Sequence, residues 1–147
     1  MLTFYYAPNT CARATHIALE EAGAGYKANR MDFSKGEQRT AEYLKLNPKG
    51  RVPLLVTERG ALTETPALLL YIAQIYPAAK LAPLDDPFAM AKLNSFTSYL
   101  CSTVHPFHAH RLRGARWSDD PAAQESMKAK VPQNMGDAFT LIENEYF

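Results

Sequence analysis

Short apolar runs alternate with amphipathic stretches along the first half of the chain. Runs rich in β-branched, aromatic and aliphatic side chains predict four strands, at residues 2–6, 26–33, 52–56 and 61–63. Turn and capping residues precede stretches of helical periodicity. These stretches predict helices that begin after Asn9 or Thr10, at residues 39–46, and at 67–75 behind Thr65 and Pro66. The predicted order is therefore βαβαββα.

The pattern changes after residue 77. Residues 78–87 are rich in proline and predict a linker. Beyond the linker, apolar side chains recur at three- and four-residue steps from Leu93 to Phe107. This spacing predicts one long amphipathic helix, kinked at Pro106, and a second helix is predicted at 124–146.

These patterns predict an α/β domain at residues 1–77, a linker at 78–87 and the first helices of an all-α domain at 88–147. Two helices with apolar faces cannot bury both faces by themselves. The apolar stretch also runs to Phe147 without a polar tail. We therefore expect either that the chain is a fragment or that a partner covers the exposed face.

Composition and charge exclude several classes of function. Of the 147 residues, 47% are hydrophobic and 21% charged, which is typical of a globular protein. Sixteen basic and fifteen acidic residues give a net charge of +1, so we expect neither a nucleic-acid nor a membrane partner. The N-terminus does not resemble a signal peptide, and no apolar run is long enough to span a bilayer. Two widely separated cysteines favour a reducing compartment, and we expect a cytoplasmic protein.

Cys11 is the first candidate for chemistry. A thiol in the first turn of a helix faces unpaired N–H groups and the positive end of the helix dipole, and both favour thiolate. A small buried side chain that packs beneath the loop is the alternative, and the sequence around Cys11 alone does not decide between them.

Two other positions could bind an extended peptide. Proline at the start of a strand, in Val52–Pro53, would expose the Val52 main chain if the bond were cis; a trans bond is the alternative. Glu64 and Thr65 open a helix whose N–H groups and hydroxyl suit a carboxylate, while the Glu64 carboxylate suits an adjacent amino group. An ordinary capped helix would give the same pattern there.

Three segments together, FYYAPNTC, NPKGRVPLLV and LTETPALLLYIAQIYP, resemble the glutathione transferases, and in particular the bacterial beta class. The resemblance covers the first domain and continues through the linker into HPFHAHRLRG. It implies a thioredoxin-like first domain, followed by an all-α domain that is incomplete in this chain. It also implies glutathione as cosubstrate.

The resemblance assigns roles position by position. Cys11 matches the active-site cysteine of the class, which contacts the glutathione sulfur, and His105 matches a histidine close to it. The remaining matched positions concern glutathione binding. They are Tyr6, a packing or secondary residue; Lys35, near the glycyl carboxylate; Val52 and Pro53, beside the cysteinyl part; Glu64 and Thr65, at the γ-glutamyl head; and Ser98, where an asparagine can reach the glutathione of a partner subunit.

Some positions depart from the pattern of the class. Ala12 replaces a serine, Pro106 replaces a lysine, and Ser98 stands for the asparagine. We expect these departures to affect the rate and the choice of electrophile more than glutathione binding. Three histidines and three arginines between residues 105 and 116 lack a carboxylate or cysteine at ligand spacing. We interpret them as a solvated helix face and expect no metal.

The resemblance implies a mechanism and a set of partners. We expect transfer of the glutathione thiol to a small hydrophobic electrophile, a bacterial homodimer and a role in detoxification. One alternative is a thiol–disulfide reductase that acts through Cys11. The other is an interaction module that keeps the fold without catalysis.

Overall fold

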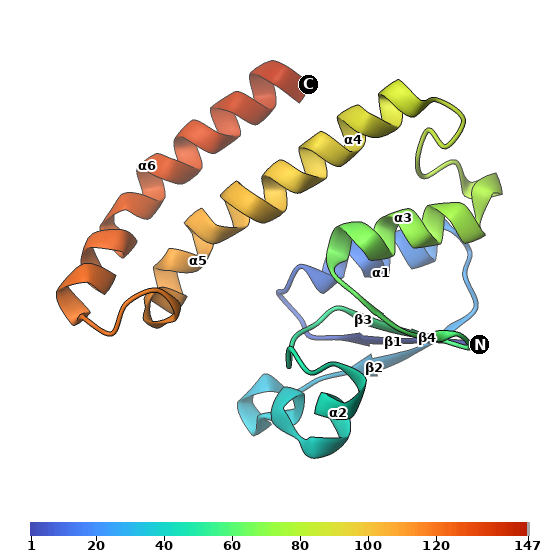
Figure 1. The fold of residues 1–147 in the computed structure, drawn as a ribbon, viewed down its shortest axis with the longest axis horizontal. Helices are drawn as coiled ribbons and strands as arrows, with labels where there is room; N and C mark the ends of the chain where they lie inside the picture. The colour runs from blue at the N-terminus through green and yellow to red at the C-terminus, as the bar shows by residue number, and fades with distance from the viewer. Residues whose placement is uncertain (147) are drawn as a thin grey trace. The chain divides into compact units, whose positions relative to one another are not determined.

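The computed structural model describes residues 1–146, which form two compact units, Met1–Met90 and a second unit from Ala91 onward (Figure 1). The first unit has the predicted βαβαββα order. Its elements are β1 Leu2–Tyr6, α1 Ala12–Glu21, β2 Tyr26–Arg30, α2 Ala41–Leu46, β3 Leu54–Thr57, β4 Gly60–Thr63 and α3 Thr65–Ile75. The predicted division after residue 77 stays a prediction.

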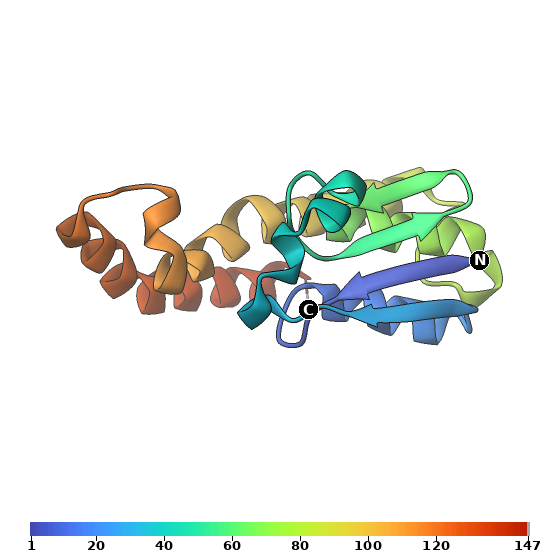
Figure 2. The ribbon, with the colours of Figure 1, turned by 90° about the horizontal axis from the view of Figure 1, so that it is seen from below.

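The four strands form one mixed sheet in the order β2-β1-β3-β4 (Figure 2). β1 pairs with β2 in parallel, through a connection that includes α1, and with β3 in antiparallel. β3 and β4 form a hairpin in which Leu54 lies opposite Thr63. This topology brings the end of β1, the start of β3 and the end of β4 to the same edge of the sheet, where α1 and α3 also begin.

Both faces of the sheet are covered. Adjacent residues of a strand point to opposite faces, and Leu54 and Leu55 are both fully buried. In Figure 1, α1 and α3 lie on one face, and α2 lies on the other. Leu19 of α1 and Leu68 and Ile72 of α3 are fully buried against the first face. Burying such aliphatic side chains stabilises a domain by about 1.5–3 kcal/mol each.

Of the element boundaries that differ from the predicted ones, three have a local cause. β2 ends at Arg30 because Asp32 caps a 3₁₀ turn, Phe33–Lys35, and accepts a hydrogen bond from the Ser34 N–H at 3.0 Å. A second 3₁₀ turn, Glu37–Arg39, delays α2 until Thr40 caps it. β3 begins at Leu54, since Pro53 has no N–H to offer a neighbouring strand.

The long amphipathic stretch is helical throughout but is not uniform. α4 covers Pro87–Tyr99, a π-helical segment covers Leu100–Val104, and α5 covers His105–Arg113. The predicted disturbance at Pro106 therefore takes the form of a π-helical widening. The His105 N–H bonds to the Leu100 carbonyl five residues back, immediately before the proline that lacks a donor.

The second predicted helix, α6, is longer than expected and covers Pro121–Tyr146. α5 and α6 pack around Val104, Ala138 and Ile142. Apolar side chains remain exposed on this unit, with Leu112 82% and Phe139 58% exposed. The predicted surplus of apolar surface is thus present. Within residues 1–146, no helix is both long and apolar enough to cross a membrane.

Candidate functional site

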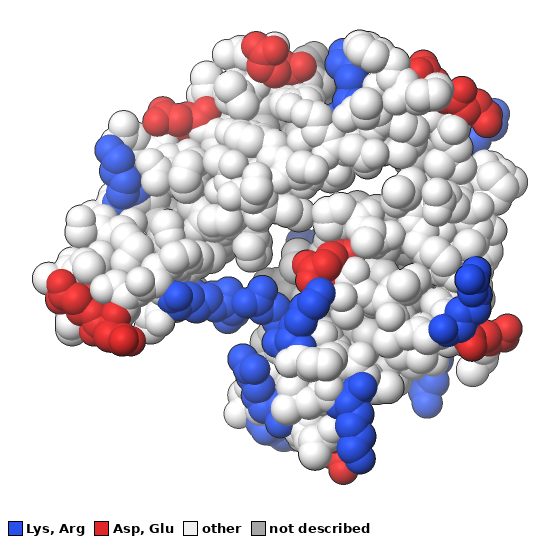
Figure 3. Space-filling view, in the orientation of Figure 1, with Lys and Arg blue, Asp and Glu red and all other residues white. Residues whose placement is uncertain are grey.

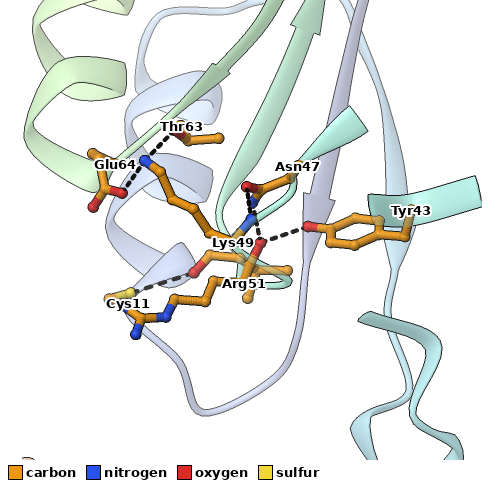
Figure 4. A network of polar contacts seen from close by, with 8 residues as sticks. Cys11, Tyr43, Asn47, Lys49, Arg51, Thr63 and Glu64 are labelled. Atoms are coloured by element: carbon orange, nitrogen blue, oxygen red, sulfur yellow. Dashed lines mark hydrogen bonds and ion pairs between the residues drawn. The ribbon is translucent and has the colours of Figure 1, made fainter. Parts of the chain in front are cut away.

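The site is built around a turn that Asn47 holds between α2 and β3 (Figure 4). Asn47 is only 2% exposed. Its amide nitrogen donates to the Arg51 carbonyl at 2.7 Å, and its amide oxygen accepts from the Lys49 N–H at 3.2 Å. The Tyr43 hydroxyl also donates to the Arg51 carbonyl, at 2.6 Å, and burial raises the pKa of this tyrosine. Two buried donors therefore fix the main chain one residue before Val52.

Gly50 is required within this turn. Its φ of +60° lies in the left-handed region that favours glycine. A Cβ atom at this position would also come within 2.8 Å of the Arg39 guanidinium and 3.0 Å of the Gln38 carbonyl oxygen. Both the backbone conformation and the lack of space for a side chain therefore favour glycine at position 50 of the NPKGRVP segment.

The Val52–Pro53 peptide bond is cis, the first of the two alternatives considered for it. The Cys11 Sγ lies 3.8 Å from the Val52 carbonyl oxygen, within reach of a thiol donor (Figure 4). Cys11 is exposed and forms no disulfide, so it is not the buried packing residue of the alternative interpretation. The start of α1 and the start of β3 therefore converge on one exposed sulfur atom.

The first N–H groups of α1 are hydrogen-bonded, whereas the sequence predicted that they would be unpaired. Cys11 occupies the cap position, and the Thr10 hydroxyl accepts the Ala12 N–H at 3.3 Å. The Thr10 and Cys11 carbonyls accept the N–H groups of Arg13 and Ala14. The expectation of unpaired N–H groups around the thiol was therefore wrong for these three residues, because the loop before the helix supplies their acceptors. The helix dipole at Cys11 remains.

The start of α3 keeps its N–H groups available. The cap position is Glu64 rather than the predicted Thr65, and Glu64 makes no side-chain cap. The first helical bond runs from the Leu68 N–H to the Glu64 carbonyl, at 3.0 Å. The N–H groups of Thr65 and Ala67 precede this bond, which leaves them suited to an anion. Glu64 has a φ of 74°, unusual for a residue with a side chain.

Lys49 joins this site, and sequence reasoning missed it. Its Nζ lies 2.5 Å from the Glu64 carboxylate and 2.9 Å from the Thr63 hydroxyl (Figure 4). The partners are 14 and 15 residues away along the chain. No local sequence pattern predicts this pairing, because it depends on the tertiary contact between the end of the β3–β4 hairpin and the Asn47 turn.

The other predicted residues lie elsewhere in their units. The Tyr6 ring packs against Phe4 and His16, with centroid distances of 5.7 and 5.0 Å. Lys35 lies in the 3₁₀ turn after β2, 3.7 Å from the Asp32 carboxylate. Ser98 lies in α4, and His105 begins α5 in the second unit. Their predicted roles stay predictions.

The segment around α2 carries more basic than acidic side chains, although Lys35 and Lys49 pair with the carboxylates of Asp32 and Glu64. Lys and Arg side chains gather around α2 (Figure 3), and residues 35–51 contain five basic and two acidic side chains. The basic residues are Lys35, Arg39, Lys45, Lys49 and Arg51, and the acidic ones are Glu37 and Glu42. In the part of the chain that is described, no group of histidine, cysteine and carboxylate side chains could hold a metal ion.

Comparison with known proteins defines the class. Residues 1–74 match the family described as "Glutathione S-transferase, N-terminal domain". The chain is 32% identical to a maleylacetoacetate isomerase from Pseudomonas aeruginosa over 148 residues, which cover 97% of this chain and 68% of that protein. The chain therefore belongs to the glutathione S-transferase family.

Two solved structures place it more closely. A glutathione transferase homologue from Sulfitobacter, with bound glutathione, is 46% identical with a TM-score of 0.93, covering 99% of this chain and 70% of the other. A bacterial beta class glutathione S-transferase from Sphingomonas chungbukensis is 31% identical with a TM-score of 0.80, covering 97% and 69%. The resemblance to the beta class and the thioredoxin-like first domain followed by helices are confirmed.

The chain spans only part of its relatives. It covers half the length of one curated bacterial glutathione S-transferase, matched over 105 residues, and 68% of the isomerase. The solved chains likewise extend beyond the portion that this chain matches.

Proposed function

We propose that this chain is the glutathione-binding part of a glutathione transferase, which joins the glutathione sulfur to small hydrophobic electrophiles. The observation that carries this proposal is the 3.8 Å approach of the Cys11 sulfur to the Val52 carbonyl, beside a cis proline and next to the open start of α3. A short peptide thiol is the ligand whose parts match these groups. The glutathione bound to the Sulfitobacter homologue supports the choice.

In the proposed complex, the cysteinyl part pairs with the Val52 main chain and its sulfur lies beside Cys11. The γ-glutamyl carboxylate takes the N–H groups and hydroxyl at Thr65, and the amino group takes Glu64. Lys35 is proposed to approach the glycyl carboxylate, and Tyr6 to support the site from beneath. The reaction forms a bond from sulfur to carbon, breaks the bond from that carbon to its leaving group, and releases the thiol proton with the leaving group.

We assign the remaining roles to the whole protein. His105 is a proposed catalytic residue, and Ser98 a proposed contact to glutathione across a homodimer. The electrophile would lie against the helical domain, part of which is supplied in the relatives by sequence beyond the length matched here. A bacterial, cytoplasmic, detoxifying enzyme without a metal is the biological setting that we propose.

The test separates conjugation from disulfide chemistry. We expect Cys11→Ala to retain most of the conjugation of glutathione to an aryl halide, because glutathione itself is the nucleophile. In the alternative, the Cys11 thiolate attacks a glutathionylated disulfide, releases the substrate thiol and is freed by a second glutathione as glutathione disulfide. Such activity would vanish entirely in Cys11→Ala and persist in the matched variant Cys101→Ala. Failure of the wild-type chain to bind glutathione would favour a non-catalytic module.

A further inference from the structure

Lys49 and Glu64 form an ion pair at the position that the proposed function reserves for an amino group. The Lys49 ammonium uses two of its donors, one on the Glu64 Oε1 and one on the Thr63 hydroxyl, at 2.5 and 2.9 Å. Glu64 is the carboxylate proposed above to receive the α-ammonium of the γ-glutamyl head. One primary ammonium of the chain therefore already occupies one oxygen, Oε1, of the carboxylate that a second ammonium would need.

The backbone of Lys49 is held firmly while its side chain crosses to the neighbouring element. Its N–H bonds to the buried Asn47 side chain at 3.2 Å, and the next residue, Gly50, bonds back to the Asn47 carbonyl at 2.9 Å. The end of β4 is equally fixed, because Thr63 pairs with Leu54 in the sheet. The two backbones are thus held in fixed positions, and the Lys49 and Glu64 side chains meet between them.

Both partners remain accessible to a ligand. The side chains are 49% and 63% exposed, so the pair lies in water and is worth at most about 1 kcal/mol. A pair of this strength can be exchanged for a ligand ammonium without large cost. It also cancels much of the negative charge that would otherwise attract that ammonium.

We propose that Lys49 is a built-in placeholder for the ligand's α-ammonium, and that it sets the affinity and the amino-group selectivity of the glutathione site. Binding exchanges one ammonium for another on Glu64, and release restores the internal pair. This inference rests on the proposed function. Lys49 acts through Glu64 and is therefore a positioning residue.

The experiment compares two ligands that differ only in the amino group. These are S-methylglutathione and its desamino analogue, S-methyl-glutarylcysteinylglycine, both blocked at sulfur so that Cys11 cannot react. We expect Lys49→Met to lower the Kd of S-methylglutathione about two- to fivefold, the fold-change that corresponds to about 0.5–1 kcal/mol. The Kd of the desamino analogue should not fall, because that ligand has no ammonium to place on Glu64.

Three further variants make the test specific. Lys45→Met removes another lysine of the same segment and should leave the ratio of the two Kd values at the wild-type level. Lys49→Arg keeps a cation and should also keep the wild-type ratio. Thr63→Val removes the second acceptor of the ammonium and should shift the ratio in the direction of Lys49→Met by a smaller factor.

Different failures have different meanings. If Lys49→Met weakens both ligands equally, Lys49 contacts a ligand carboxylate and the placeholder proposal is wrong. An unchanged ratio in both Lys49→Met and Thr63→Val overturns it as well. If the wild-type chain binds neither ligand, the proposed function itself fails.

Discussion

The starts of α1 and α3 lie at the same edge of one sheet, yet their first N–H groups are used differently. At α1, the Thr10 side chain and the loop carbonyls accept the N–H groups of the first turn, and a thiol occupies the cap position. At α3, the cap residue Glu64 makes no side-chain cap, and N–H groups remain ahead of the helical ladder. The start of α1 presents a sulfur atom on a helix whose first N–H groups are bonded, and the start of α3 keeps N–H groups that, in the proposed complex, bind a carboxylate.

In the proposed complex, this difference lets one fold hold the central thiol and the γ-glutamyl carboxylate of a tripeptide by different means. The thiol of Cys11 needs a fixed position beside the Val52 main chain, which a satisfied helix start provides. A carboxylate needs donors that nothing else has taken. The Asn47 turn lies between the two starts and fixes the edge from which both are reached.

The largest expected effect comes from disrupting the Asn47 turn, which lies between the starts of α1 and α3. Asn47→Ala removes a buried donor and acceptor from the turn before Val52, so we expect the free energy of unfolding to fall by about 2 kcal/mol or more. Urea denaturation followed by circular dichroism measures the change. The control, Asn94→Ala, removes an exposed amide in α4 and should change stability by less than about 0.5 kcal/mol. Equal stability of the two variants would contradict the role given to the turn.

The second prediction compares the two helix starts directly. Thr65→Val removes the hydroxyl from the open start, and we expect the Kd for glutathione to rise about tenfold or more, the usual cost of a lost hydrogen bond to a charged group. Cys11→Ala removes a side chain whose contact with the ligand in the proposed complex is to the glutathione sulfur alone, so the Kd for glutathione should change by less than about threefold. Calorimetric titration measures both. A larger loss in Cys11→Ala than in Thr65→Val would reverse the comparison.

The third prediction concerns the start of α1. Thr10→Ala leaves the Ala12 N–H without its side-chain acceptor and removes the 2.7 Å bond from the Thr10 hydroxyl to the Ala7 carbonyl. We expect a loss of about 1 kcal/mol in the free energy of unfolding, measured by urea denaturation. Thr140→Ala, at an exposed position in α6, is the matched control and should have little effect. No loss in Thr10→Ala would show that the loop carbonyls alone close this start.

The smallest effect concerns Asp32, which caps the 3₁₀ turn Phe33–Lys35. Hydrogen bonds from the Ser34 hydroxyl and the Ser34 N–H hold the pKa of Asp32 below its usual value. Because the folded-state pKa is lowered, the stability that Asp32 contributes is present above the unfolded pKa of about 3.9 and is lost as the pH falls through the folded value.

We therefore expect Asp32→Asn to lower Tm slightly at pH 7, with a difference from wild type that shrinks in acid. Thermal unfolding at a series of pH values measures it. Ser34→Ala should reproduce part of the loss, since it removes the hydroxyl donor. A difference that is constant from pH 7 to pH 2 would contradict the assignment.

The sequence by itself determined the element order of the first unit and indicated several positions of the candidate site. Alternating and helical patterns predicted all seven elements of the first domain, because strand and helix periods differ and each strand is bounded by turn residues. The predicted site residues Cys11, Val52 and Glu64 lie at the ends of these elements. Once the order βαβαββα is known, the sheet topology brings such ends to one edge.

Only the tertiary structure decided which donors and acceptors pair with one another in hydrogen bonds and ion pairs. The hydroxyl of Thr10 closes the start of α1, the Asn47 side chain holds the carbonyl of Arg51, and Lys49 reaches Glu64 across the hairpin. A local pattern shows that a donor or acceptor exists, but its partner depends on distances between segments that are far apart in the sequence. Periodicity carries no information about those distances, because they are set when the hairpin, the turn and the two helices pack together.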